Sequence, residues 1–137
     1  MSATNNADGA SVVLAECVRF TDTTPANQTW VYATKPLSGP IKTYDGTKCL
    51  DVPDGDAMNG NHLQIWSCVS GSPNQEWKYR SVYPNLTIEW VGKNKCVNIA
   101  NGNMSVGTPV CLSRSLAGPW MLTLSPTSTL LAPDCGL

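Results

Sequence analysis

The stretch CLDVPDGDAMNGNHLQIWSCVSGSPNQEW, residues 49–77, decides the fold. Along residues 63–66, apolar side chains alternate with Gln64 and Trp66, as in a strand with one buried face. Asp51 lies between two apolar residues, so its side chain is predicted to point outward from its own strand as well. An outward tryptophan is often packed under a loop, but a carboxylate, an amide and an indole on one face suit a sugar ring and its hydroxyls.

Length and composition bound the class of protein. The 137 residues suffice for one domain with a single core. A net charge of −1, with 14% charged residues, gives no field that favours nucleic acid or an anionic membrane, and no run is apolar enough to insert into a bilayer. Short strands of Val, Ile, Leu, Thr and Trp alternate with Gly and Pro turn signals. This pattern predicts an all-β domain.

The six cysteines indicate disulfides and a secreted, oxidising setting. There is one histidine and no CxxC or CxxH pair, so we expect no metal site and no cofactor. The first residues lack an apolar signal segment, and we therefore interpret the chain as a mature or excised domain. A cytosolic protein with free thiols is the alternative.

An internal repeat organises the chain. The sequence NQEW at residues 74–77 has a counterpart in NQTW at 27–30 and a weaker one in PW at 119–120. The three tryptophans are 47 and 43 residues apart, which is about the length of a four-strand unit. Upstream of each tryptophan lies a Gly-x-x-apolar-x-apolar strand. These strands begin at Gly9, Gly60 and Gly107.

The strand that opens the second repeat also recurs. Residues 44–52 match residues 90–99, whereas only eight residues precede Gly9 in the first repeat. The tail from 129 to 137 resembles the missing piece, so the first repeat would be completed by the C-terminus and no edge strand would stay open. The predicted single domain 1–137 thus has repeats of about 1–39 plus 125–137, 40–85, and 86–124.

The repeat suggests how the cysteines pair, although six cysteines allow 15 connectivities. Each repeat would link its opening strand to the end of the following strand, and a link within the second repeat would add about 3 kcal/mol. The third repeat is irregular, because Cys111 aligns with Gln64 of the second repeat and not with Cys68. The predicted disulfides are Cys49–Cys68, Cys17–Cys135 and Cys96–Cys111.

Three repeats ending in Gln-x-Trp, one of them opened by Cys-Leu-Asp-Val, resemble the ricin B-type (R-type) lectin domain. The resemblance covers nearly the whole chain and is strongest over residues 41–79. Members of that family are β-trefoils, in which a barrel is capped by hairpins and each repeat forms one lobe. The resemblance therefore implies a β-trefoil with three pseudo-threefold repeats.

The resemblance also implies a sugar site in the second repeat, where every position of the family's motif matches. Asp51 would accept hydrogen bonds from adjacent axial and equatorial hydroxyls of a galactose-like sugar, and Trp66 would stack on the ring. Asn74 would contact the same hydroxyls, Gln64 would line the pocket edge, and Gln75 would hold Asp51 in place.

The other two repeats depart from this motif. In the first, Val13 and Ala15 replace the Gln and the Trp, and Leu137 stands where the Asp is needed. The corresponding residues of the third repeat are Asn98, Cys111 and Ser113. We therefore expect one site out of three.

Other aromatic and polar residues are assigned by position. Asp54 and His62 are candidate auxiliary contacts, with turn formation and simple solvation as the alternatives. Trp90 fits either surface packing or an auxiliary contact. The Gln-x-Trp tryptophans recur where no site can exist, which makes them core anchors. They are Trp30, Trp77 and Trp120.

The leading functional hypothesis is a non-catalytic lectin or module for galactose- or N-acetylgalactosamine-containing glycans. An enzyme is disfavoured, because no nucleophile–base motif or metal pair occurs. A β-trefoil that binds proteins through its loops, such as a protease inhibitor, is the alternative. A single shallow site binds weakly, so oligomers or attachment to a larger protein would supply avidity.

Overall fold

The structure is a computed structural model that describes residues 1–18, 25–33, 37–82 and 85–114. These residues form strands and short 3-10 turns, which confirms the all-β class. No helix among them is long and apolar enough to cross a membrane. The predicted boundaries of the domain and of its repeats stay predictions.

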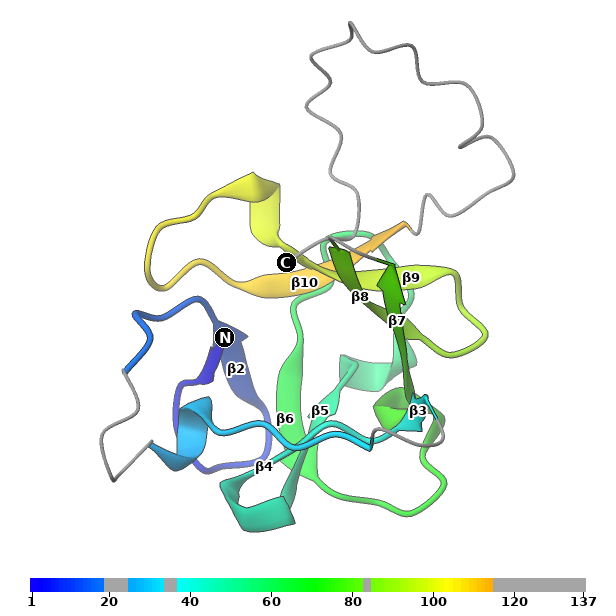
Figure 1. Cartoon of the computed structure of the whole chain (residues 1–137), viewed down its shortest axis with the longest axis horizontal. Helices are drawn as coiled ribbons and strands as arrows, with labels where there is room; N and C mark the ends of the chain where they lie inside the picture. Colours follow the sequence, from blue (N-terminus) through cyan, green and yellow to red (C-terminus); the bar gives the residue numbers. More distant parts are fainter. Residues whose placement is uncertain (19–24, 34–36, 83–84, 115–137) are drawn as a thin grey trace, which may run out of the picture.

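Two antiparallel five-stranded sheets make up the described part of the chain, and β2, β6 and β5 lie side by side in the first (Figure 1). The first sheet has the order β1 (Ser2–Ala3), β2 (Ala10–Val13), β6 (Gln64–Ser67), β5 (Lys48–Asp51) and β4 (Lys42–Thr43). The second has the order β10 (Val110–Arg114), β9 (Lys95–Ile99), β8 (Asn85–Trp90), β7 (Trp77–Val82) and β3 (Ser38–Gly39). The 3-10 turns are η1 (Ala26–Gln28), η2 (Tyr44–Gly46), η3 (Pro53–Gly55), η4 (Pro73–Gln75) and η5 (Ala100–Gly102).

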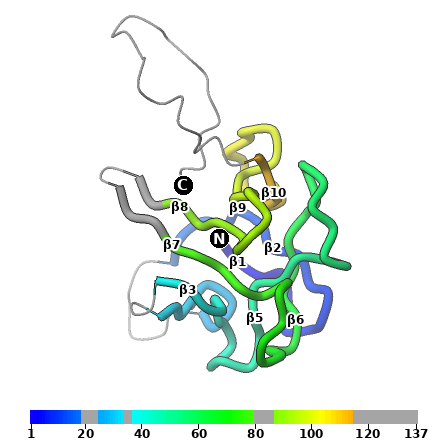
Figure 2. The backbone as a smooth tube through the Cα atoms, turned by 90° about the vertical axis from the view of Figure 1, so that its right-hand side faces the viewer, coloured from blue at the N-terminus to red at the C-terminus, as the bar shows by residue number. Residues whose placement is uncertain are grey.

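Equivalent residues of the three repeats meet where the lobes join. Val12 N–H donates to the Leu63 carbonyl at 3.1 Å, and Leu63 N–H donates to the Val110 carbonyl at 2.8 Å. All three side chains are buried in the core. The paired strands β5 and β6 run along one side of the molecule, and β7 and β8 along another (Figure 2). The apolar positions of the repeat therefore converge on one core, as the strand periodicity predicts.

Tryptophans anchor this core, as the repeat indicates. The Trp77 indole is fully buried and donates to the Leu50 carbonyl at 2.9 Å. Trp30 donates in the same way to the Met1 carbonyl at 3.1 Å. Trp90, for which the sequence left two interpretations, is also fully buried and donates to a backbone carbonyl. Trp120 lies outside the described residues.

The N-terminal strand corrects one expectation. Ser2 pairs with Val13 in β2, just as Asp51 pairs with Gln64 in β6. The N-terminal residues therefore occupy the position beside β2 for which we expected the tail. The tail itself lies outside the described residues. The replacement is possible because strand pairing here needs only backbone groups, and not a cysteine.

Of the predicted disulfides, Cys49–Cys68 is present and joins residues separated by 19 positions. The pairing of Cys17 with Cys135 involves a residue outside the described part of the chain. The predicted Cys96–Cys111 disulfide is not formed. The β9–β10 ladder places Cys111 opposite Asn98, so the two cysteines are diagonal neighbours in a regular ladder, farther apart than a disulfide allows.

Candidate functional site

The predicted site residues of the second lobe come together in one cavity. Strands β5 and β6 pair Asp51 with Gln64, and the turns η3 and η4 contribute further residues to the same cavity. The cavity has a volume of about 260 Å³, and we call it the Asp51 cavity. It is lined by Asp51, Asp54, Gln64, Trp66, Val69, Ser72, Asn74 and Gln75.

Asp51 is the centre of this arrangement. Its side chain is buried, and its two carboxylate oxygens accept one amide hydrogen bond each: from Gln64 Nε2 at 2.8 Å and from Gln75 Nε2 at 3.1 Å. Burial raises the pKa of the Asp51 carboxyl, while the two amide hydrogen bonds oppose that rise. Each oxygen has further lone-pair capacity toward the cavity, so a held carboxylate can accept from ligand hydroxyls.

The side-chain amide of Gln75, which holds Asp51, is itself fixed by hydrogen bonds to the backbone. Its Oε1 accepts from the Val69 N–H at 2.9 Å, and its Nε2 also donates to the Ser67 carbonyl at 3.2 Å. These bonds orient the amide unambiguously, with Nε2 toward the carboxylate. The sequence-based role of Gln75 as a brace for Asp51 matches this geometry.

The turns η3 and η4 bring Asp54 and Asn74, respectively, to the rim. Asp54 and Gly55 have left-handed backbone conformations, with φ of 54° and 64°. A Cβ atom at Gly55 would lie 2.9 Å from Asn74 Oδ1, so only glycine permits this approach. The Asn74 carbonyl also accepts from the Val52 N–H at 3.1 Å, which joins the two turns.

Trp66 forms the exposed wall of the cavity. Its side chain is 43% exposed, unlike the buried tryptophans of the core. Behind it lies the turn that precedes β2, because a Cβ atom at Gly9 would be 3.9 Å from both the indole and Gln64 Oε1. An open indole face beside hydrogen-bonding side chains is the kind of surface on which a sugar ring stacks.

Asp8 supports this wall and was missed by sequence reasoning. Its carboxylate accepts from Lys48 Nζ, from the Ser67 N–H at 2.6 Å and from Ser67 Oγ at 2.9 Å. The hydrogen bond to Lys48 is the main cause that lowers the pKa of the Asp8 carboxyl. Asp8 and Ser67 lie 59 positions apart in the sequence, and Asp8 belongs to no repeated motif. The sequence therefore holds no signal for this contact.

His62 does not reach the Asp51 cavity. It is exposed and forms an isolated bridge with Cys111 at the junction with the third lobe. The strand β6 begins only at Gln64, and the chain before it pairs with the third lobe. Of the two candidate auxiliary residues, only Asp54 lines the cavity.

The first lobe retains the scaffold of the site without its chemistry. Gln28 donates to the Glu16 carbonyl at 3.1 Å and accepts from the Val18 N–H at 3.1 Å, as Gln75 does in the second lobe. Ser2 faces Val13 where the second lobe pairs Asp51 with Gln64. Among the described residues of this lobe, no carboxylate occupies that position.

The third lobe differs in a similar way. Asn98 faces Cys111 and donates to Ser113 Oγ at 3.2 Å. The turn η5 repeats the left-handed conformation of η3, with φ of 55° at Asn101 and 64° at Gly102. The third lobe therefore keeps the backbone turn of the site. Asn98 and Ser113, however, stand where the second lobe has a carboxylate and an indole.

Comparison with known proteins places this chain in a family. The model of the ricin-type β-trefoil lectin domain matches residues 1–118. A stretch of 33 residues, 23% of the chain, is 52% identical to β-galactoside-specific lectin 2 of Viscum album, and it spans only 6% of that lectin.

Solved structures show the same fold. The designed threefold-symmetric protein ThreeFoil matches with a TM-score of 0.67 at 20% identity, over 85% of this chain and 83% of its own. The C-terminal half of an earthworm R-type lectin, solved with GalNAc, matches with a TM-score of 0.58 at 18% identity, over 84% and 78%. The β-trefoil that the family resemblance implied is thereby confirmed. The chain belongs to the ricin-type β-trefoil lectin family.

Proposed function

We propose that the chain is a non-catalytic carbohydrate-binding module that takes galactose- or N-acetylgalactosamine-type sugars in the Asp51 cavity. The observation that carries the proposal is the buried Asp51 carboxylate, held by Gln64 and Gln75 beside the exposed indole of Trp66. Such a carboxylate accepts from two adjacent hydroxyls, while the indole covers the apolar face of the same ring.

The choice of sugar rests on the family and its members. Galactose and its N-acetyl derivative carry an axial hydroxyl next to an equatorial one, which one carboxylate can receive together. The Viscum album relative is named for β-galactosides, and the earthworm neighbour was solved with GalNAc. Both facts support the proposed sugar class for this chain.

Titration with methyl β-galactoside and with GalNAc tests the proposal. We expect the wild-type chain to bind with a dissociation constant of about 1 mM, because a single shallow site buries few ligand atoms. The Asp51→Ala and Trp66→Ala variants should each lose at least about 90% of the affinity, the equivalent of about 1.4 kcal/mol or more.

The matched control is Asn98→Ala, the counterpart of Asp51 in the third lobe. Its binding should equal that of the wild type. If the Asp51 and Trp66 variants keep wild-type affinity, the site assignment is wrong. If the wild-type chain binds neither sugar nor any other glycan on an array, the proposed function is wrong.

The setting of the molecule follows from the same features. The Cys49–Cys68 disulfide supports action in an oxidising compartment outside the cell. One weak site per chain also suits a protein that binds glycans as an oligomer or as an appendage of a larger protein, because linked sites raise the effective affinity.

A further inference from the structure

A second cavity adjoins the Asp51 cavity across the loop of residues 69–72. Its volume is about 340 Å³, and it shares Val69, Ser72 and Gln75 with the Asp51 cavity. Its other walls include the Cys49–Cys68 disulfide, so we call it the disulfide cavity. The volume lies at the lower end of the range of about 300–1,000 Å³ that is usual for ligand pockets.

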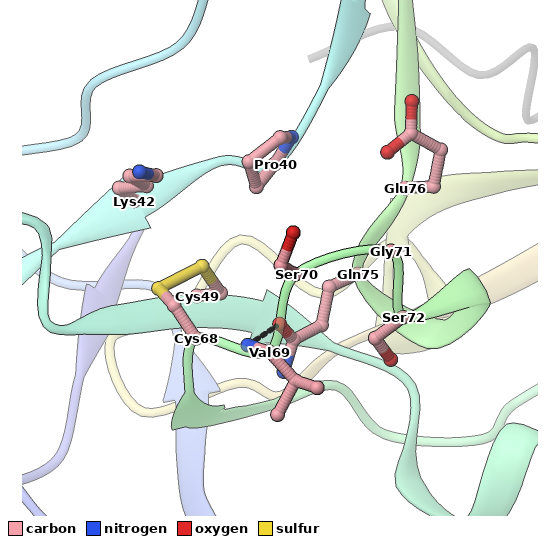
Figure 3. Close-up of a pocket in the computed structure, with 10 residues that line it drawn as sticks. All are labelled: Pro40, Lys42, Cys49, Cys68, Val69, Ser70, Gly71, Ser72, Gln75 and Glu76. Atoms are coloured by element: carbon pink, nitrogen blue, oxygen red, sulfur yellow. Dashed lines mark hydrogen bonds between the residues drawn. A yellow bond between two sulfur atoms is a disulfide. The ribbon is translucent and has the colours of Figure 1, made fainter.

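The chemistry of the disulfide cavity is mixed. Pro40 and the disulfide give it an apolar side, and the Ser70 hydroxyl points toward Pro40 (Figure 3). Lys42 and Glu76 flank it on opposite sides (Figure 3). Within the described part of the chain neither of these two charges forms an ion pair, since the pair recorded there joins Lys48 to Asp8.

This combination selects a class of ligand. An ammonium group donates and a carboxylate accepts, so together they suit groups that do both, such as hydroxyls. Because the two charges are opposite, an anionic group attracted by Lys42 would be repelled by Glu76. The apolar side adds a surface for the C–H face of a ring. A neutral pyranose meets all three conditions.

The two cavities meet at the loop of residues 69–72. Val69 points away from Pro40 and lines both cavities, while Ser70 points toward Pro40 and lines the disulfide cavity (Figure 3). Gly71, at the turn of the loop, has no side chain and has open space where a Cβ atom would stand. One ligand can therefore extend from the first cavity over the loop into the second.

We propose that the disulfide cavity is a subsite for a second, neutral sugar of a glycan whose terminal galactose occupies the Asp51 cavity. This subsite rests on the proposed function of the Asp51 cavity. It gives the chain a preference for certain galactose-terminated oligosaccharides over the free monosaccharide.

The test compares methyl galactosides with a panel of neutral galactose-terminated disaccharides that differ in linkage. We expect at least one disaccharide to bind the wild-type chain about tenfold more tightly than methyl galactoside, as a second partly buried ring would give. The Ser70→Trp variant fills the disulfide cavity from an exposed loop position and should abolish this gain. Its affinity for methyl galactoside should stay that of the wild type.

Ser105→Trp, the same change at an exposed position of the third lobe, is the control and should keep the gain. The subsite is refuted if no disaccharide exceeds methyl galactoside, if the gain survives in Ser70→Trp, or if that variant loses methyl galactoside binding as well. A wild-type chain that binds none of these sugars refutes the proposed function and the subsite with it. Binding of methyl galactoside without any disaccharide gain refutes the subsite alone.

Discussion

At the scale of single residues, Trp66 and Trp77 have opposite environments within one lobe. Trp77 is fully buried and hydrogen-bonded to the Leu50 carbonyl, whereas Trp66 is 43% exposed. We predict that Trp77→Ala lowers the free energy of unfolding by about 3–5 kcal/mol. Trp66→Ala should lower it by less than about 1 kcal/mol while losing sugar affinity. Denaturant unfolding of both variants measures this contrast, and equal destabilisation would contradict it.

Asp51 should set an acid limit for binding. Burial raises the pKa of its carboxyl above 3.8, and the charges of Asp54 and Asp8 add to the rise. Only the ionised carboxylate accepts from two hydroxyls, so sugar affinity should fall as the pH drops through this raised pKa. Titrations of methyl β-galactoside over a series of pH values measure the fall. An affinity that stays constant down to pH 3.8 would contradict this prediction.

The same raised pKa affects folding stability in the opposite direction from sugar affinity. A native carboxyl with a raised pKa binds its proton more readily than the unfolded chain does. The stabilisation from this proton is fully present below 3.8 and is lost as the pH rises through the native pKa. Asp51→Asn, which cannot ionise, is the control for both effects.

At the scale of elements, the turn before β2 supports β6 across the lobe boundary. Asp8 accepts from Lys48 and from Ser67, the residue that follows Trp66. We predict that Asp8→Ala weakens sugar binding, because β6 and the indole lose this support, although Asp8 does not line the Asp51 cavity. Asp8→Asn keeps an acceptor for the Ser67 N–H and should weaken binding less.

Asp45→Ala, at an exposed turn position, is the matched control for this prediction. It should bind sugar as the wild type does. Titration with methyl β-galactoside distinguishes the three variants. Wild-type affinity in Asp8→Ala would show that β6 holds the indole without the first lobe.

The Cys49–Cys68 disulfide is the covalent link between β5 and the loop that follows β6. Its chain separation of 19 residues corresponds to a stabilisation of about 3 kcal/mol in the chain-entropy model. We predict that replacing both cysteines by alanine lowers the free energy of unfolding by about that amount. Chemical denaturation of the variant measures it, with the reduced wild type as the control. An unchanged midpoint would contradict the prediction.

At the scale of the whole molecule, three lobes share a scaffold and one carries the proposed site. A single site of this depth binds weakly, so avidity has to come from several copies. We predict that fusion to a dimeric carrier increases retention on a galactose-coated surface by about 10² or more. The affinity for methyl β-galactoside in solution should not change, and its titration should give one site per chain. Equal retention of monomer and dimer would contradict this.

Much of the molecule was predictable because its signals are local or repeated. The period-2 alternation of residues 63–66 placed Gln64 and Trp66 outside the core, and the cavity contains both. The repeated Gln-x-Trp motif separated Trp77 from Trp66. In contrast, the Cys96–Cys111 pairing followed from elimination, and the ladder register overruled it.

The sequence by itself determined the all-β class, the lobe that carries the proposed site and six of the residues that line it, whereas Val69 and Ser72 were not predicted. The class follows from periodicity and repetition, which one chain displays along its length, and the site follows from the resemblance of the second repeat to the family's motif. The tertiary structure alone decided that Ser2 lies beside Val13, that Asp8 supports β6, and that a second cavity adjoins the first. Asp8 and Ser67 lie 59 positions apart, and Ser2 stands in place of the motif residue of the other lobes, so no repeated or local pattern encodes these features.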